Sequence, residues 1–264
     1  MIDFHNHILP NVDDGSKSLD ISLEMLTHAA NQGITDVVNT VHYQHPKVET
    51  EDISLNRIQR KVNELQKKLD QNDIRIKLHL GAEVFFLPNL ISIKDDQLAT
   101  FSHGKYMLIE FQVHQIPDVQ KQQLFDLKMS GVVPIIAHPE RYKAVQENIN
   151  IVADWLEAGC LIQVDAGSPL GYLGSKSKIA SEKIIKNGWC QLIGSDSHDN
   201  KNRNFCLLES VDLIRSWGIS NVDEWVNDNP SSIIDGTPIS VDFDYMEEAK
   251  PNFFSRIKDR IGLS

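Results

Sequence analysis

Residues 2–7 read Ile-Asp-Phe-His-Asn-His, a short run that ends in two histidines separated by one residue. The first three residues of this run predict a short strand. Alternate strand residues point to the same side, so His5 and His7 can reach one ion while Asn6 faces away. Asp14 follows in a glycine-containing loop, from which its carboxylate can reach back over the strand end. A single histidine is more often structural, but this arrangement indicates half of a metal site.

The totals favour one large α/β domain followed by a tail, because 264 residues can build a core without help from disulfides or metals. The formal net charge is −11, and no basic stripe is present, so we expect no nucleic-acid partner. No apolar run long enough for a bilayer and no signal peptide are visible, which predicts a cytoplasmic protein without membrane insertion. Three widely spaced cysteines, Cys160, Cys190 and Cys206, predict buried thiols rather than nucleophiles.

Strand and helix patterns alternate along the chain. Short apolar or β-branched runs predict strands at residues 2–4, 34–40, 75–80, 105–111, 132–137, 161–164 and 190–194. Helical spacing of apolar residues predicts helices at residues 19–32, 53–69, 117–129, 149–158, 176–187 and about 205–217. Residues 85–104 are irregular. This alternation is typical of a parallel sheet, and at this length it favours a closed or nearly closed (β/α) barrel.

Polar side chains suited to metal binding follow most of the predicted strands. They are His5, His7, Asp14, His42, Glu83, Glu110, His138, Asp196 and His198. Because the carboxyl ends of the strands meet at one face of such a barrel, where active sites lie, we expect these side chains to gather there. A carboxylate at the mouth of a buried strand is costly unless it is paired or bound to a cation. The sequence therefore predicts a metal centre at this face.

Nine ligands are too many for one ion, since a zinc ion takes about four, so we expect two or three divalent ions that share carboxylates. Imidazole and carboxylate ligands without thiolate fit Mn, Fe, Zn or Mg. Clustered ions activate water and clamp phosphoryl oxygens, which indicates phosphate-ester hydrolysis by a metal-bound hydroxide. Arg141 and Arg203 each lie just beyond a predicted ligand and could bind the phosphate, although surface ion pairs explain them equally well.

Seven motifs occur together over residues 1–235. They are His5-Asn-His7, Asp13-Asp-Gly15, Thr40-Val-His42, Gly81-Ala-Glu83, Ile109-Glu-Phe111, Ala137-His-Pro-Glu-Arg141 and Ser195-Asp-Ser-His198. Their order and spacing resemble the polymerase-and-histidinol-phosphatase (PHP) superfamily, and more narrowly the bacterial manganese-dependent protein tyrosine phosphatases encoded with capsule and exopolysaccharide genes. The resemblance implies a distorted seven-stranded (β/α)7 TIM-like barrel and a trinuclear centre, most often of Mn²⁺, held by the nine residues above.

The same resemblance implies that Arg141 and Arg203 bind the phosphate. It also implies a partner, the phosphotyrosine-rich C-terminal tail of a bacterial tyrosine autokinase that controls polysaccharide synthesis. It leaves the oligomeric state open.

Three other functions are compatible with parts of this pattern. A small-molecule phosphatase of the same superfamily, for example one acting on histidinol phosphate, would use the same metals. An amidohydrolase also begins with His-x-His on a barrel strand, but it leaves Asp14, His42 and His198 unexplained. A degenerate barrel kept as an interaction module predicts gaps in the ligand set, and the sequence has none. The remaining histidines, His28, His45, His79, His103 and His114, are expected to be structural or exposed, with His45 closest to a predicted ligand.

The sequence changes character near its end, so we predict a catalytic barrel over residues 1–235 and an extension over residues 236–264. Residues 242–248 are acidic, and residues 252–263 are basic and amphipathic. We expect the amphipathic stretch to form a helix packed on the domain, with a docking peptide as the alternative.

Overall fold

The computed structural model describes residues 1–46, 48, 53–101 and 103–239. Its centre is one parallel sheet whose seven strands follow each other in chain order. The strands are β1 (Ile2–Asn6), β2 (Asp36–Tyr43), β3 (Lys77–Phe85), β4 (Tyr106–Glu110), β5 (Val133–Ala137), β6 (Leu161–Asp165) and β7 (Leu192–Gly194). A bridge between Asn6 and Ser197 brings the two edges together, so the sheet forms a nearly closed barrel. The predicted fold class is confirmed.

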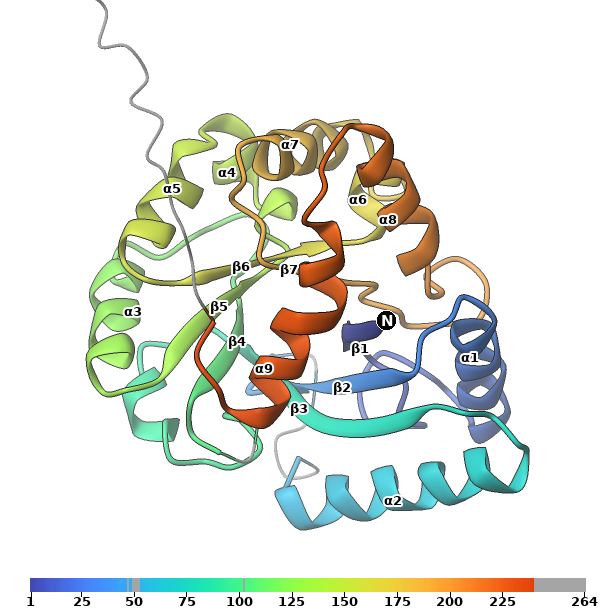
Figure 1. The fold of residues 1–264 in the computed structure, drawn as a ribbon. Coiled ribbons are helices and arrows are strands. Elements are labelled where there is room, and N and C mark those ends of the chain that lie inside the picture. Colours follow the sequence, from blue (N-terminus) through green and yellow to red (C-terminus); the bar gives the residue numbers. More distant parts are fainter. Residues whose placement is uncertain (47, 49–52, 102, 240–264) are drawn as a thin grey trace, which may run out of the picture.

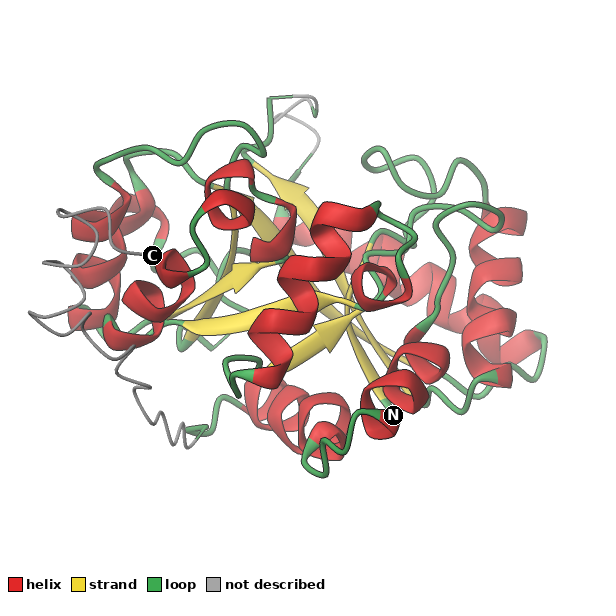
Figure 2. Ribbon diagram, turned by 90° about the horizontal axis from the view of Figure 1, so that it is seen from above, coloured by secondary structure: helices red, strands yellow, loops and turns green. Residues whose placement is uncertain are grey.

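The helices surround this barrel (Figures 1 and 2). They are α1 (Leu19–Asn31), α2 (Leu55–Gln71), α3 (Gln120–Met129), α4 (Lys143–Glu147), α5 (Asn150–Glu157), α6 (Gly167–Leu170), α7 (Ser175–Lys186), α8 (Leu207–Ser216) and α9 (Asn229–Asp235), with 3₁₀ turns η2 (Leu90–Ile93) and η3 (Pro139–Arg141) and the π-helical turn η4 (Glu224–Asp228). Helix α1 shows how a capping residue and an apolar face define one of these helices. Ser18 caps it by accepting a hydrogen bond from the backbone N–H of Ile21, and its buried face packs on the sheet.

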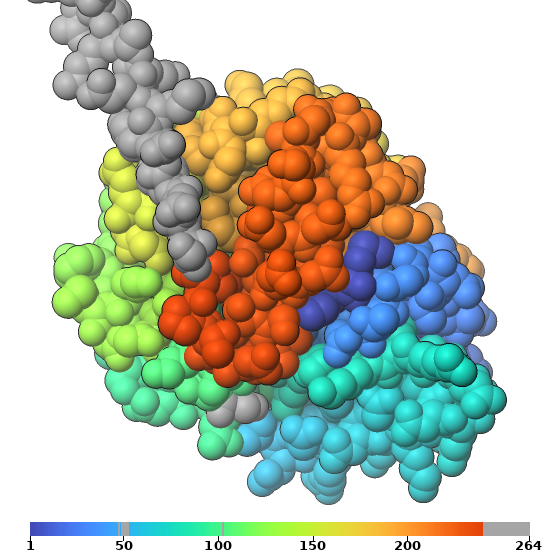
Figure 3. Space-filling model, in the orientation of Figure 1, coloured from blue at the N-terminus to red at the C-terminus, as the bar shows by residue number. Residues whose placement is uncertain are grey.

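Apolar side chains form two cores, one outside the barrel and one within it. The outer core lies between the helices and the sheet. The inner core includes Phe4, Val38, Leu108 and Leu192, and Ile233 of α9 packs against it. Figure 3 shows the last described segment, coloured orange to red, lying over this end of the barrel. With its amino end closed by α9, the barrel keeps its carboxyl end for polar side chains.

The two edges of the sheet are joined near their carboxyl ends. The backbone N–H of His7 donates to the Ser197 carbonyl at 2.8 Å, and that of Asp196 donates to the His5 carbonyl at 2.7 Å. The register of β1 against β2 shifts between Asp3 and Asn6. The seam of the barrel therefore passes between the first and the last of the predicted metal ligands.

Several predicted boundaries differ from the structure. The strand expected at residues 75–80 runs over Lys77–Phe85, so Gly81 lies inside it and Glu83 is a strand residue. The short helices α4 and α6 were not expected, because one or two turns carry too few residues to show a period. In the described part of the chain, no helix is both long and apolar enough to cross a membrane. The acidic and amphipathic stretches of the tail, 242–248 and 252–263, lie outside the described residues.

Candidate metal centre

The nine predicted ligands converge on the carboxyl end of the barrel. Each comes from a strand or from the loop that follows one: His5, His7, Asp14, His42, Glu83, Glu110, His138, Asp196 and His198. All of them are buried except Asp14, which is exposed. The registers of the sheet explain part of this convergence, because His42 pairs with Glu83 across β2 and β3. The parallel sheet thus brings together side chains that are far apart in sequence.

Glu83 lies at the middle of the group. Its Oε2 atom is 3.3 Å from His5 Nε2 and 3.4 Å from His7 Nε2. The same oxygen is 3.1 Å from His42 Nδ1, and the other oxygen is 2.8 Å from His138 Nε2. One carboxylate therefore faces four imidazoles, so Glu83 is suited to serve as a ligand shared with several of them.

Two more carboxylates extend the group to either side. Asp196 Oδ1 lies 3.5 Å from His5 Nε2 and 3.3 Å from His7 Nε2. Asp14 Oδ1 lies 3.2 Å from His42 Nε2 and 3.3 Å from His198 Nε2. The ligand atoms consequently fall into overlapping sets rather than around a single point.

Four such sets have ligand atoms that all lie within 4.8 Å of one another. They are His7, Asp14, His42 and His198; His5, His7 and Asp196; His5, Glu83 and His138; and His42, His45 and Glu110. Because these sets share members, the arrangement suits more than one ion. The sequence prediction treated His45 as structural or exposed, whereas the structure buries it beside His42 with its Nε2 atom 3.7 Å from Glu110 Oε2.

Buried polar atoms in this group fit a bound cation. The buried atoms without a hydrogen-bond partner within the described structure include four that face this group: His5 Nε2, His7 Nε2, His42 Nδ1 and Glu110 Oε2. A buried donor or acceptor left without a partner costs about 1–3 kcal/mol, so native proteins rarely keep several together. Metal coordination would satisfy all four atoms at once.

The electrostatics point in the same direction. Burial and the neighbouring Glu83 raise the pKa of Glu110 to about 8. Burial and then Arg141 lower the pKa of His138 to about 4, which keeps its imidazole in the neutral form that binds metals. Hydrogen bonds from His198 and His42 lower the pKa of Asp14. These carboxylates repel one another unless protons or cations lie between them.

Two side chains that sequence reasoning missed orient the ligands. Asp13 Oδ2 lies 2.9 Å from His7 Nδ1 and also accepts a hydrogen bond from the backbone N–H of His42. Burial alone would raise the pKa of Asp13, but the charge and hydrogen bond of His7 and the charge of His42 together outweigh it, and the pKa falls to about 2. Gln163 Oε1 lies 2.9 Å from His5 Nδ1. Each contact engages the Nδ1 atom and leaves Nε2 directed to the centre, the usual role of such partners in metal sites.

Two glycines permit the close packing around these ligands. A Cβ atom on Gly15 would lie 2.1 Å from the carbonyl oxygen of His7, and one on Gly194 would lie 2.6 Å from His5 Cβ. Any larger residue would push the loop that carries Asp14, or strand β7, away from the centre. By contrast, His138 and Asp196 adopt positive φ angles of 32° and 44° although neither is glycine. Such strain is typical of functional sites.

The two predicted arginines border the same hollow. Arg141 and Arg203 both donate to Asp196 Oδ2, and Arg203 also donates to the Asp196 carbonyl at 3.1 Å. Their side chains are 21% and 33% exposed, so neither is an ordinary surface ion-pair partner. The hollow measures about 530 Å³ and is lined by Asp14, His42, His45, Pro46, Glu83, Phe85, Glu110, Phe111, Gln112, Val113, His114, Arg141, Asp196, His198 and Arg203. Its lining thus combines charged side chains with apolar ones, such as Phe85 and Phe111.

Comparison with known proteins gives a consistent result. The family model described as capsular polysaccharide synthesis, CpsB/CapC, matches residues 1–235. The chain is 35% identical over 210 residues to the putative tyrosine-protein phosphatase CapC of Staphylococcus aureus, covering 79% of this chain and 81% of the relative. It is 32% identical over 212 residues to the tyrosine-protein phosphatase YwqE of Bacillus subtilis, covering 80% and 82%.

Solved structures agree with these sequence matches. The crystal structures of YwqE from Bacillus subtilis and CpsB from Streptococcus pneumoniae, described as unique metal-dependent tyrosine phosphatases, include a chain that superposes with a TM-score of 0.85 at 29% identity, covering 91% of this chain and 96% of that one. Histidinol phosphate phosphatase from Lactococcus lactis, at 18% identity and a TM-score of 0.55 over 83% and 94%, shares the fold. The match over residues 1–235 and the similarity to these relatives show that the chain belongs to the CpsB/CapC family.

Proposed function

We propose that this chain is a metal-dependent phosphatase that removes phosphate from tyrosine residues of proteins. The observation that carries the proposal is one hollow lined by six of the nine predicted ligands and by two partly buried arginines, with the other three predicted ligands grouped with those six. This pairing suits a phosphate ester, because cations and guanidinium groups both stabilise charge on phosphoryl oxygens. The names of its relatives supply tyrosine as the phosphorylated residue.

The proposed cofactor is a set of two or three Mn²⁺ ions. Their ligands would be the nine residues of the centre, among which Glu83 faces the most imidazoles, and the fourth ligand set would add His45. The set contains five imidazoles, four carboxylates and no thiolate, which suits Mn²⁺ and leaves Fe, Zn and Mg as competitors. When bound, such ions lower the pKa of water and neutralise negative charge on phosphate.

The chain's own residues have separate tasks in this scheme. Arg141 and Arg203 hold the phosphoryl group, since the guanidinium of each keeps further N–H donors beyond those bonded to Asp196. Asp13 and Gln163 keep two histidines in the tautomer that presents Nε2. Attack by a water oxygen on phosphorus forms one P–O bond while the bond to the tyrosine oxygen breaks and a proton from the water passes to that oxygen, which yields inorganic phosphate and tyrosine.

A cysteine nucleophile does not fit this structure. Cys160 and Cys190 are buried, and burial raises the pKa of Cys160 to about 12. None of the described residues that line the hollow is a cysteine. The thiolate that a cysteine phosphatase needs is therefore missing from the site, which leaves water as the nucleophile.

We further propose that the physiological substrate is the phosphotyrosine-bearing tail of a bacterial tyrosine kinase that regulates capsule or exopolysaccharide synthesis. Exposed side chains, Gln112 and His114, stand at the rim of the hollow, so a substrate can reach it while attached to a larger chain. The second candidate is a small-molecule phosphatase, favoured by the fold shared with histidinol phosphate phosphatase.

The deciding experiment compares a phosphotyrosine peptide with histidinol phosphate, using enzyme stripped with EDTA and resupplied with Mn²⁺. We expect a strong preference for the peptide and no turnover before Mn²⁺ is added. His138→Ala should keep the circular dichroism spectrum and lose turnover. Preference for histidinol phosphate would support the small-molecule phosphatase instead. If neither substrate is hydrolysed, the amidohydrolase and the interaction module become the better explanations.

A further inference from the structure

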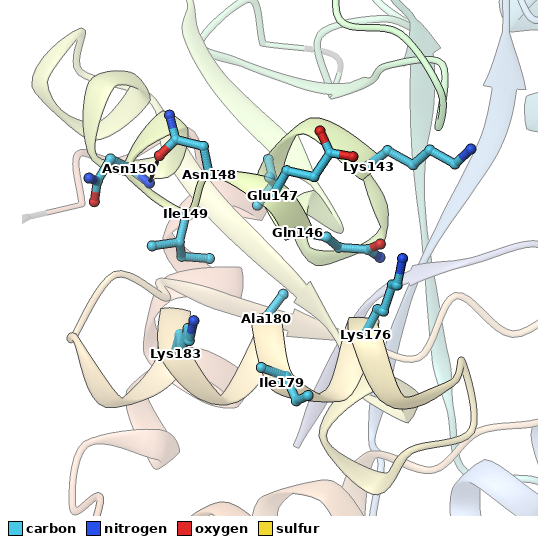
Figure 4. Close-up of a pocket in the computed structure, with 11 residues that line it drawn as sticks. Lys143, Gln146, Glu147, Asn148, Ile149, Asn150, Lys176, Ile179, Ala180 and Lys183 are labelled. Atoms are coloured by element: carbon cyan, nitrogen blue, oxygen red, sulfur yellow. Dashed lines mark hydrogen bonds between the residues drawn. The ribbon is translucent and has the colours of Figure 1, made fainter.

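A second hollow lies between the α4–α5 segment and α7 (Figure 4). Its volume is about 470 Å³, and no member of the nine-ligand centre lines it. Three lysines surround it, Lys143, Lys176 and Lys183, together with a single acidic residue, Glu147. Figure 4 shows Lys143 and Lys176 at one end of the hollow and Lys183 at the other.

One wall of this hollow is hydrogen-bonded to η3, the turn that carries Arg141. Gln146 Nε2 donates to the carbonyl of Glu140 at 2.9 Å, and its distance to Ser177 Oγ on α7 is 3.4 Å. Glu140 belongs to η3, the turn that carries Arg141. The wall of the second hollow and one arginine of the catalytic hollow are therefore parts of one hydrogen-bonded unit.

A backbone contact joins the two hollows. The N–H of Lys143 donates to the carbonyl of Val113 at 3.0 Å. Val113 lines the catalytic hollow and Lys143 lines the second one. An extended peptide advances about 3.3 Å per residue, so one whose phosphotyrosine enters the catalytic hollow needs only a few further residues to pass over this contact.

The second hollow carries positive charge, whereas the chain as a whole carries negative charge. The chain carries a net charge of −11, which repels acidic peptides in general. Around the hollow three ammonium groups face one carboxylate, and none of the three forms an ion pair within the described part of the chain. Ile179 stands among them with 56% of its side chain exposed, an apolar contact surface between the charges.

We propose that this hollow binds acidic residues, aspartate or glutamate, that flank the phosphotyrosine in the substrate. The inference rests on the proposed function, because it assigns a flanking sequence to the same substrate. The lysines attract carboxylates, and the hydrogen bond from Gln146 to Glu140 holds the segment that carries Lys143 against the turn that carries Arg141. Peptides with acidic residues near the phosphotyrosine are then preferred over neutral ones.

The test measures kcat/KM for three phosphotyrosine peptides with the Mn²⁺-loaded full chain at low ionic strength. One peptide has acidic flanks, one has neutral flanks, and one has a second phosphotyrosine in place of the acidic residues. For three exposed ion pairs we expect about a tenfold preference for the acidic over the neutral peptide, and a smaller ratio in high salt. The triple variant Lys143→Ala, Lys176→Ala and Lys183→Ala should bring this ratio close to one.

A matched variant separates the hollow from the general charge. Lys67→Ala, Lys77→Ala and Lys105→Ala remove the same charge from exposed positions elsewhere, and this variant should keep the wild-type ratio. Equal loss in both triple variants, or a wild-type ratio near one, would overturn the inference while the proposed function stands. If only the doubly phosphorylated peptide is preferred, the hollow binds phosphate and not carboxylate, which would also overturn the inference. Hydrolysis of p-nitrophenyl phosphate but of no peptide would reject the protein substrate and the inference together.

Discussion

Replacing Tyr142 by phenylalanine should destabilise the barrel at the ends of two ligand-bearing strands. Tyr142 is fully buried, and its hydroxyl donates to the carbonyl of Ala137 at 2.7 Å. The same hydroxyl accepts from the backbone N–H of Phe111 at 3.0 Å. These two backbone groups are neighbours of the predicted ligands His138 and Glu110. One hydroxyl therefore ties the ends of β4 and β5 together.

The size of the effect follows from these two contacts. Tyr142→Phe leaves the Phe111 N–H without its partner, which costs about 1–3 kcal/mol, and removes a second hydrogen bond worth about 1 kcal/mol. Since phenylalanine fills nearly the same volume, no cavity cost is added. We expect the free energy of unfolding to fall by about 2–4 kcal/mol, a large share of the roughly 5–15 kcal/mol that stabilises a typical domain.

Urea unfolding of the EDTA-treated protein measures this change without the contribution of metal binding. The matched control is Tyr172→Phe, because Tyr172 is 59% exposed and its hydroxyl donates to Glu209 at the surface. The control should change the free energy of unfolding by less than about 0.5 kcal/mol. An equally small change for Tyr142→Phe would show that the two buried bonds do not hold the strand ends, and would refute the reasoning.

Three further results are expected. Arg203→Ala should raise KM for phosphate esters at unchanged metal content by elemental analysis, and an unchanged KM would remove Arg203 from the phosphate site. Gly15→Ala should lower the bound metal per chain, because its Cβ would lie 2.1 Å from the His7 carbonyl oxygen; full occupancy would contradict the proposed loop position. Burial raises the pKa of Asp36, but the hydrogen bonds with His79 and Thr35 and the nearby positive charges together outweigh it, and the net shift is downward. Its stabilising effect is then present above about pH 4 and lost as the pH falls through the lowered pKa. Asp36→Asn should accordingly reduce stability at pH 6 and leave it nearly unchanged near pH 2, as thermal melts at the two pH values would show.

The fold was accessible from the sequence because each strand is short, apolar and bounded by a helix pattern. The order of the motifs also predicted the family, which the match over residues 1–235 confirms. The boundary at Gly81 was wrong for a physical reason. A glycine after an apolar run predicts the end of a strand, but Thr40 and Gly81 pair in register, and this pairing continues the strand to Phe85.

The site was partly predictable. Parallel strands bring their carboxyl ends together, so ligands such as His42 and Glu110 were expected to meet, and the structure places them side by side. Their roles as metal ligands stay a prediction, as does the division of the chain at residue 235. Side chains that act through the ligands left weaker signals. Asp13 cannot be told from its neighbour Asp14 by sequence, whereas Gln163, a polar residue inside an apolar strand, could have been noticed.

The seam of the barrel has a consequence for how the protein is made. His5 and His7 leave the ribosome long before Asp196 and His198, which lie across the seam from them. Contacts of such long range form late in folding and slow it. A nascent chain can therefore hold only a partial set of ligands, and the complete centre can form only once the last strand has been synthesised and docked against the first.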